Sequence, residues 1–314
     1  THSGAGRIVT VRMRPLSLAE RGVGKPTVSL ARLLGGSVAA VEGRTDVGLE
    51  DYVNEIVRSG FPGLRRFSGR ALRLQLDGYL RRIIDTDFQE QGFTVRRPEV
   101  LERWMAAYAA ATATTASYET IRDAATGGQG DKPAKTTTQP YRDILERLWI
   151  VDPVPPWLPS RNMLNRLAQP SKHHLADPAL AVRMLGLDAD TLLSGTEAGP
   201  RIPRDGTLLG HLFESLVTLC VRVYAQSAEA RVRHLRLHGG RQEVDLIVER
   251  ADQRVIALEI KLSSTVGDDD VKSLLWLREQ IADDLLDAAV INTGPQAYRR
   301  KDGIAVIPAA LLGA

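Results

Sequence analysis

Two apolar segments joined by a short polar turn constrain the fold of this chain most strongly. Residues 243–250 and 254–262 are rich in β-branched and aliphatic side chains, and Ala251-Asp252-Gln253 lies between them. Such a pattern predicts a β-hairpin. If the hairpin is centred at Asp252, Asp245 lies directly opposite Glu259, because the two residues are equally distant from the turn.

The hairpin would bring two carboxylates and a lysine together. Cross-strand partners lie about 5 Å apart at Cβ, and like charges placed there are destabilising unless a proton or a cation separates them. Lys261 follows Glu259 by two residues and therefore points to the same face of its strand. We predict that Asp245, Glu259 and Lys261 are the catalytic residues of a metal-dependent phosphodiesterase.

A third carboxylate is expected from the helix that precedes the hairpin. Glu214 lies among apolar neighbours in the segment 210–217, and buried acidic residues are rare unless they are paired or bind a metal. We predict that Glu214, Asp245 and Glu259 bind Mg²⁺. Metal-bound water would attack the phosphodiester, and Lys261 would position that water or stabilise the charge that develops.

A simpler interpretation remains open for part of this face. Glu243 lies opposite Lys261 in the same register, and the two could form an exposed ion pair worth ~0–1 kcal/mol. That pair alone does not explain why Asp245 and Glu259 face each other.

Composition fits an ordinary globular protein. The 314 residues are 43% hydrophobic and 25% charged, and this length predicts two or three domains. No apolar run resembles a membrane span, and we expect no membrane partner. The lone Cys220 excludes an intrachain disulfide and a cysteine-based zinc site, which favours a reducing, cytoplasmic setting.

The middle of the chain is predicted to be helical. Helices are expected over 98–111, 117–125 and 136–148, followed by a β element at 149–155, which is the outline of a winged helix-turn-helix. Gln139 and Arg142 on the third helix, and Arg241 in a basic stretch ahead of the hairpin, are predicted to contact DNA. The net charge of +3 permits DNA binding without requiring it. A helical domain that only packs on its neighbours explains the pattern as well.

The last module, from residue 206 onward, predicts a mixed sheet. A helix at 207–226, strands near 231–238, 243–250 and 254–262, a helix at 268–284 and strands at 288–292 and 304–307 follow one another. This order is typical of a mixed sheet flanked by helices, so the fold class is α/β (α+β).

The order of several motifs resembles the AAA+ class ATPases that carry a C-terminal DUF4143 domain. The motifs are Ala5–Glu20, Ser59–Pro62, Tyr79–Asp87, Leu145–Ile150, Leu175–Pro178, Gly210–Glu214, Glu243–Asp245 and Glu259–Lys261. The resemblance implies that 1–92 is the end of the ATPase core and its helical lid, and that 93–160 is winged-helix-like. It further implies a connector at 161–205 and, at 206–314, a DUF4143 domain similar to PD-(D/E)xK nucleases.

The resemblance also implies ATP as a cofactor, bound by a segment upstream of this chain. Gly22-Val-Gly-Lys25 is followed by Pro26 where a phosphate-binding loop carries Ser or Thr, and its spacing is wrong for that loop. No residue of this chain is therefore assigned to ATP.

Two functional hypotheses follow. In the first, this is the C-terminal part of a DNA-associated ATPase with a nuclease-like module that binds Mg²⁺ and cleaves phosphodiesters. In the second, the nuclease-like and winged-helix modules are a non-catalytic scaffold that binds DNA, a protein partner or further copies of the chain.

Overall fold

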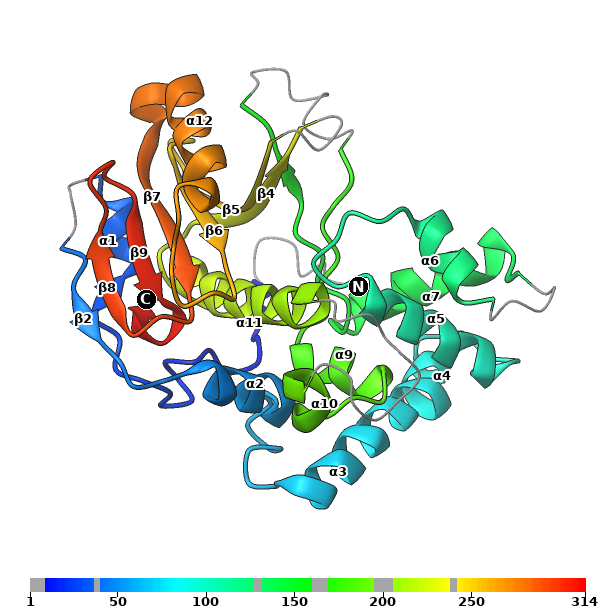
Figure 1. Cartoon of the computed structure of the whole chain (residues 1–314). Helices are drawn as coiled ribbons and strands as arrows, with labels where there is room; N and C mark the ends of the chain where they lie inside the picture. The colour runs from blue at the N-terminus through cyan, green and yellow to red at the C-terminus, as the bar shows by residue number, and fades with distance from the viewer. Residues whose placement is uncertain (1–8, 37–39, 127–131, 160–168, 195–205, 238–241) are drawn as a thin grey trace.

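The computed structural model describes residues 9–36, 40–126, 132–159, 169–194, 206–237 and 242–314 (Figure 1). Its centre is a mixed eight-stranded sheet in the order β2-β8-β9-β7-β6-β5-β4-β3. The fold class predicted from the sequence, a mixed sheet flanked by helices after a helical middle, is confirmed. The strands of this sheet are β2 (Gly43–Arg44), β3 (Pro156–Trp157), β4 (Arg231–Arg236), β5 (Glu243–Glu249), β6 (Val255–Ile260), β7 (Leu285–Asn292), β8 (Gln296–Arg299) and β9 (Ala305–Pro308).

The hairpin predicted from the sequence is formed by β5 and β6. The strands are antiparallel, and Leu246 pairs with Leu258 while Glu249 pairs with Val255. This register places the centre of the turn at Asp252, as predicted. Strands β6, β7 and β9 are mutually parallel. The connection from β6 to β7 contains the helix α12 (Lys272–Ile281), as a parallel crossover requires, whereas β7 is connected to β9 through the antiparallel strand β8.

Helices bury both faces of the sheet. The long helix α11 (Gly206–Ser227) packs on Leu246 and Leu258, whereas α12 (Lys272–Ile281) packs through Leu274 and Leu277 on the opposite face. Side chains alternate between the faces of a strand, so β5 and β6 contribute to both cores. This explains why both strands are apolar along nearly their whole length.

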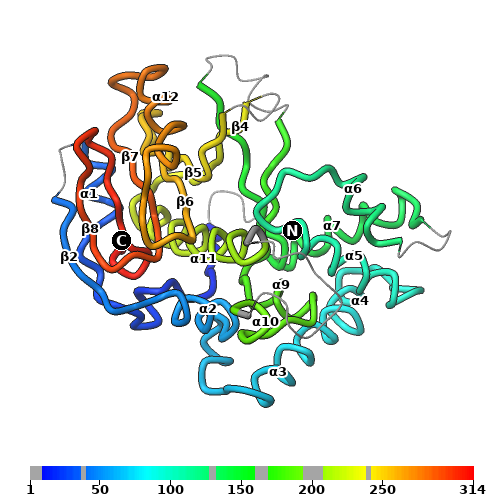
Figure 2. The backbone as a smooth tube through the Cα atoms, viewed as in Figure 1, coloured from blue at the N-terminus to red at the C-terminus, as the bar shows by residue number. Residues whose placement is uncertain are grey.

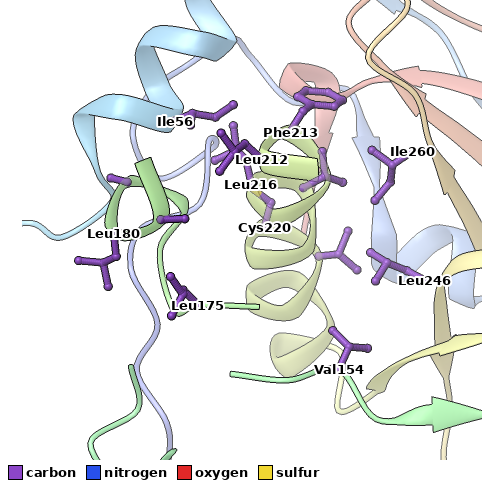
Figure 3. Packing of buried hydrophobic residues seen from close by; sticks show 14 of the residues in the cluster. Ile56, Val154, Leu175, Leu180, Leu212, Phe213, Leu216, Cys220, Leu246 and Ile260 are labelled. Atoms are coloured by element: carbon purple, nitrogen blue, oxygen red, sulfur yellow. The ribbon is translucent and has the colours of Figure 1, made fainter. Parts of the chain in front are cut away.

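Helix α11 lies at the centre of the larger core. Figure 3 shows Leu246 and Ile260 of the sheet on one side of it, and Ile56 and Leu180 on the other. The latter two belong to residues 30–194, which we call the helical part. Among the described helices, α11 alone is long and apolar enough to cross a membrane, over Leu208–Ser227. By length and composition it differs from the prediction that no apolar run resembles a membrane span. Since 78% of that window is buried inside the protein, α11 is a core helix of this fold.

The helical part agrees closely with the predicted segments. A π-helical turn at Ile83–Asp87 joins α3 to α4, so these three pieces form one continuous helical stretch. Whether the middle of the chain is a winged helix, and whether the four predicted segments are domains, stay predictions. The helices of this part are α1 (Leu30–Leu34), α2 (Leu49–Arg58), α3 (Gly69–Arg82), α4 (Phe88–Glu90), α5 (Pro98–Ala110), α6 (Tyr118–Ala124), α7 (Lys135–Arg147), α9 (Pro178–Met184) and α10 (Ala189–Ser194).

Two short sequence motifs meet in space. Asp177 caps α9 by accepting a hydrogen bond from the Ala179 N–H, and its second oxygen accepts bonds from the Ser59 hydroxyl and the Gly60 N–H. Ser59 has a positive φ of 63°, which is unfavourable for a residue with a side chain. The buried Asp177 carboxylate holds that strained turn in place.

The segment that leads out of the helical part joins the sheet. Strand β3 pairs in parallel with β4 and forms one edge of the sheet (Figure 2). Just before it, Val151 and Val154 form isolated antiparallel bridges with Leu175 and Lys172. Residues 151–157 and 172–175 therefore connect the helical part directly to α11 and the sheet.

Candidate carboxylate site

The predicted pair of carboxylates lies where the sequence placed it. Extending the register of β5 and β6 by one position sets Asp245 opposite Glu259, and both residues are buried. Asp245 Oδ2 accepts a hydrogen bond of 2.9 Å from the Ile260 N–H, which fixes the carboxylate beside the end of β6. Glu259 Oε2 is buried and has no hydrogen-bond partner among the described residues.

A lysine that the sequence analysis did not consider occupies the centre of this site. The ammonium of Lys172 lies 2.8 Å from Glu214 Oε1, 3.0 Å from Asp245 Oδ1 and 3.2 Å from Glu243 Oε1. Lys172 is 1% exposed, so these carboxylates, not water, surround its charge. We refer to Lys172, Glu214, Glu243 and Asp245 as the lysine cluster.

The predicted pair between Glu243 and Lys261 is wrong. Glu243 binds Lys172 and, through its second oxygen, Arg236 at 3.0 Å. Lys261 instead binds Glu259 Oε1 at 2.9 Å. Glu259 and Lys261 are two positions apart on one face of the chain, which lets their side chains reach each other without crossing the hairpin.

Burial and like charges distort the titration of the acidic groups. Burial raises the pKa of Glu214 to about 8, helped by the charge of Asp245 and opposed by Lys172. Burial likewise raises the pKa of Glu259 to about 8, again helped by Asp245 and opposed by Lys261. Burial disfavours the ammonium of Lys172, but Asp245, Glu214 and Glu243 outweigh it, so the pKa of Lys172 is raised. The site therefore contains more buried acid than its cations neutralise.

The residues predicted to bind Mg²⁺ do not fit the ion in this arrangement. Mg²⁺ requires oxygen ligands at about 2.0–2.1 Å in near-octahedral geometry. Here, an ammonium lies between Glu214 and Asp245, and the second oxygen of Asp245 is already bonded to the backbone. Among the residues that the structure describes, no group of three His, Cys, Asp or Glu side chains is arranged to hold a metal. Mg²⁺ binding stays a prediction.

The residues predicted to contact DNA are only partly described. Gln139 and Arg142 line one cavity of about 390 Å³ between α5, α6 and α7. The Arg142 guanidinium lies 4.8 Å from the centre of the Tyr118 ring and 2.9 Å from Asp143 Oδ1, so part of its charge is already neutralised. Arg241 lies outside the described residues. DNA contact by these residues stays a prediction.

A second buried ion cluster lies next to the lysine cluster. Asp152 binds Arg222 of α11 at 2.6 Å, Arg12 at 2.8 Å and Arg14 at 3.1 Å. Arg222 also donates hydrogen bonds to the carbonyl oxygens of Asp152 and Pro153. We refer to Asp152, Arg12, Arg14 and Arg222 as the aspartate cluster.

Comparisons with known proteins divide the chain into two matched regions. Residues 49–191 match the family model DUF8612, and residues 209–312 match DUF4143; both are described as domains of unknown function. The resemblance to DUF4143 is thus supported at the C-terminal end, while its ATPase and nuclease implications are not tested. No curated protein and no solved structure matches the chain. Lys172 falls within the first region and its three carboxylate partners within the second.

Proposed function

We propose that this chain is a non-catalytic, DNA-associated scaffold that works with an AAA+ class ATPase. The observation that carries this proposal is the Lys172 ammonium, which lies within 3.2 Å of three carboxylates at the place predicted for a metal. The coupling to an ATPase rests on the resemblance of the motif order alone.

The chemistry of phosphodiester cleavage supports a non-catalytic role for the sheet. A divalent metal lowers the pKa of a bound water and neutralises charge on the phosphoryl oxygens. An ammonium supplies a single positive charge and cannot activate a water in this way. Because Lys172 is 1% exposed and surrounded by carboxylates, its charge is directed toward the protein interior, away from any substrate.

The observation that favours DNA binding is a row of polar and basic side chains on helix α7. Lys135, Gln139 and Arg142 are spaced by four and three residues, which places them on one face of α7, and all three line the same cavity. Basic and amide side chains along one helix face are typical of contacts to phosphates and base edges.

Binding and cleavage can be tested with the same preparation. We expect fluorescence anisotropy to detect binding of a short DNA duplex that weakens steeply as salt is raised, because released counterions drive such binding. Arg142→Ala should weaken binding, whereas Arg254→Ala, which removes an arginine paired with Asp252 at the hairpin turn, should not. Absence of binding at low salt would contradict the DNA association.

A metal-dependent nuclease is the second candidate, because the buried Glu259 Oε2 has no hydrogen-bond partner among the described residues. Glu259 also lies with Asp245 and Lys261, the other two residues predicted to be catalytic. We expect neither the wild-type protein nor Lys261→Ala to nick supercoiled plasmid in Mg²⁺ or Mn²⁺. Nicking by the wild type that is lost in Lys261→Ala would establish the nuclease and refute the scaffold.

A further inference from the structure

The cation of the carboxylate site comes from a different part of the chain than the carboxylates. Glu214 lies on α11 and Asp245 on β5, both in the region that matches DUF4143. Lys172 lies 42 residues before Glu214 and 73 before Asp245, in the region that matches DUF8612. The site is therefore complete only when the two regions are packed together.

The backbone around Lys172 holds its side chain in that position. Its N–H donates to the Val154 carbonyl oxygen at 2.9 Å, and its carbonyl oxygen accepts from the Val154 N–H at 2.8 Å. The next residue, His173, donates its N–H to Thr114 O at 2.8 Å. These hydrogen bonds fix the backbone at Lys172 and His173, so the Lys172 side chain is held at its place in the lysine cluster.

We propose that Lys172 is the built-in substitute for the divalent cation of this carboxylate site, supplied by region 49–191 to close the site of region 209–312. The inference rests on the non-catalytic function proposed above and deepens it. The protein then needs no divalent metal to fold, because the positive charge that the carboxylates require is covalently part of the chain.

The substitution of a metal by a lysine has a physical consequence that can be measured. A group of buried carboxylates without a cation is strongly unfavourable. When the lysine charge is removed, we therefore expect the carboxylates to bind a cation from solution in its place. Methionine resembles lysine in length and lacks the charge. Lys172→Met should therefore retain the packing while vacating the place of the cation.

Thermal unfolding in the presence of metal tests this directly with the full chain. For Lys172→Met we expect the Tm to rise with Mn²⁺ or Mg²⁺, by about 5 °C when the metal exceeds its Kd 100-fold. The wild-type Tm should not respond, and Asp245→Asn added to Lys172→Met should abolish the response. Titration calorimetry with Mn²⁺ should report one site in Lys172→Met and none in the wild type.

Lys132→Met provides a matched control. Lys132 also pairs with two carboxylates, Glu119 and Asp123, but all three side chains are exposed. If any lysine removed from between carboxylates created a metal site, this variant would respond as well, and the special role of Lys172 would be refuted.

Each remaining outcome decides the proposal. A wild-type protein that binds Mn²⁺ in a manner lost in Asp245→Asn would overturn it, since Lys172 would then not exclude the metal. If Lys172→Met is unfolded without metal, recovery of folding in Mn²⁺ supports the proposal. Failure of both Lys172→Met and the smaller Lys172→Ala to respond to Mn²⁺, folded or unfolded, overturns it. None of these readouts involves DNA, so they are separate from the test of DNA association.

Discussion

The aspartate cluster and the lysine cluster are opposites in composition. In the first, a single buried carboxylate is surrounded by three guanidinium groups, and in the second a single buried ammonium is surrounded by three carboxylates. Each cluster joins the segment 151–177 to α11, through Asp152 and Arg222 in the first and through Lys172 and Glu214 in the second. Both therefore hold the helical part against the C-terminal sheet.

The two clusters differ in whether a change of protonation near neutral pH can reduce their excess charge. Burial disfavours the Asp152 carboxylate, but Arg222, Arg14 and Arg12 outweigh it and lower the pKa of Asp152. In the lysine cluster the pKa of Glu214 is raised to about 8. A carboxylate can take up a proton near neutral pH, whereas arginine keeps its proton. The lysine cluster can therefore relieve its excess charge, and the aspartate cluster cannot.

The largest effect is expected in the aspartate cluster. Asp152→Ala leaves the buried Arg222 without its carboxylate, which should cost about 3–5 kcal/mol of the free energy of unfolding, measured by urea denaturation. The loss should be similar at pH 6 and pH 8. Asp143→Ala, which removes an exposed partner of Arg142, is the matched control and should cost less than about 1 kcal/mol. Equal losses in both variants would show that the buried Asp152 stabilises the protein no more than an exposed partner of an arginine does.

The lysine cluster should be less sensitive and should depend on pH. Lys172→Met leaves carboxylates that can be protonated, so we expect a loss of about 3 kcal/mol at pH 8 and a clearly smaller loss at pH 6. Urea denaturation without divalent metal at both pH values measures it. A loss that is the same at both values would show that protonation does not relieve this cluster.

The wild-type protein should itself lose stability as pH rises from about 6.5 to 8. Glu214 has a folded pKa of about 8, above its ordinary value of 4.5, so the folded state binds more protons than the unfolded state in this window. Each such carboxylate contributes up to about 2 kcal/mol over this window. Below pH 6.5 the buried His174, whose pKa is lowered by burial, acts in the opposite direction.

Glu214→Gln distinguishes this origin of the pH dependence. The variant keeps the size of the side chain and removes the titrating group, so its stability should vary less between pH 6.5 and 8 than that of the wild type. An unchanged slope would assign the pH dependence to other groups.

The smallest effect is expected at the rim of the site. The Lys261 side chain is 33% exposed and pairs with Glu259, so water screens its charge. Lys261→Met should change the free energy of unfolding by less than about 1 kcal/mol. A loss as large as that of Lys172→Met would place Lys261, not Lys172, at the centre of the carboxylate site.

The part of the site that depends on local sequence patterns could be predicted from the sequence. The turn at Asp252 set the hairpin register, which opposed Asp245 to Glu259, and apolar neighbours indicated that Glu214 is buried. Lys172 was not found because no local pattern links residues 73 positions apart. One signal was present: Lys172 precedes the mostly apolar segment 173–182, and a buried lysine requires acidic partners. Strands β2, β3 and β8 were not predicted for the same reason, since short strands at or next to a sheet edge are defined by their neighbours.

A crystal structure of the wild-type protein, from crystals soaked in Mn²⁺, would show whether Lys172 occupies the place of a divalent cation. We expect the Lys172 ammonium between Glu214 and Asp245, with no anomalous peak among the carboxylates. A Mn²⁺ ion bound by Glu214 and Asp245, with the Lys172 side chain displaced, would contradict it.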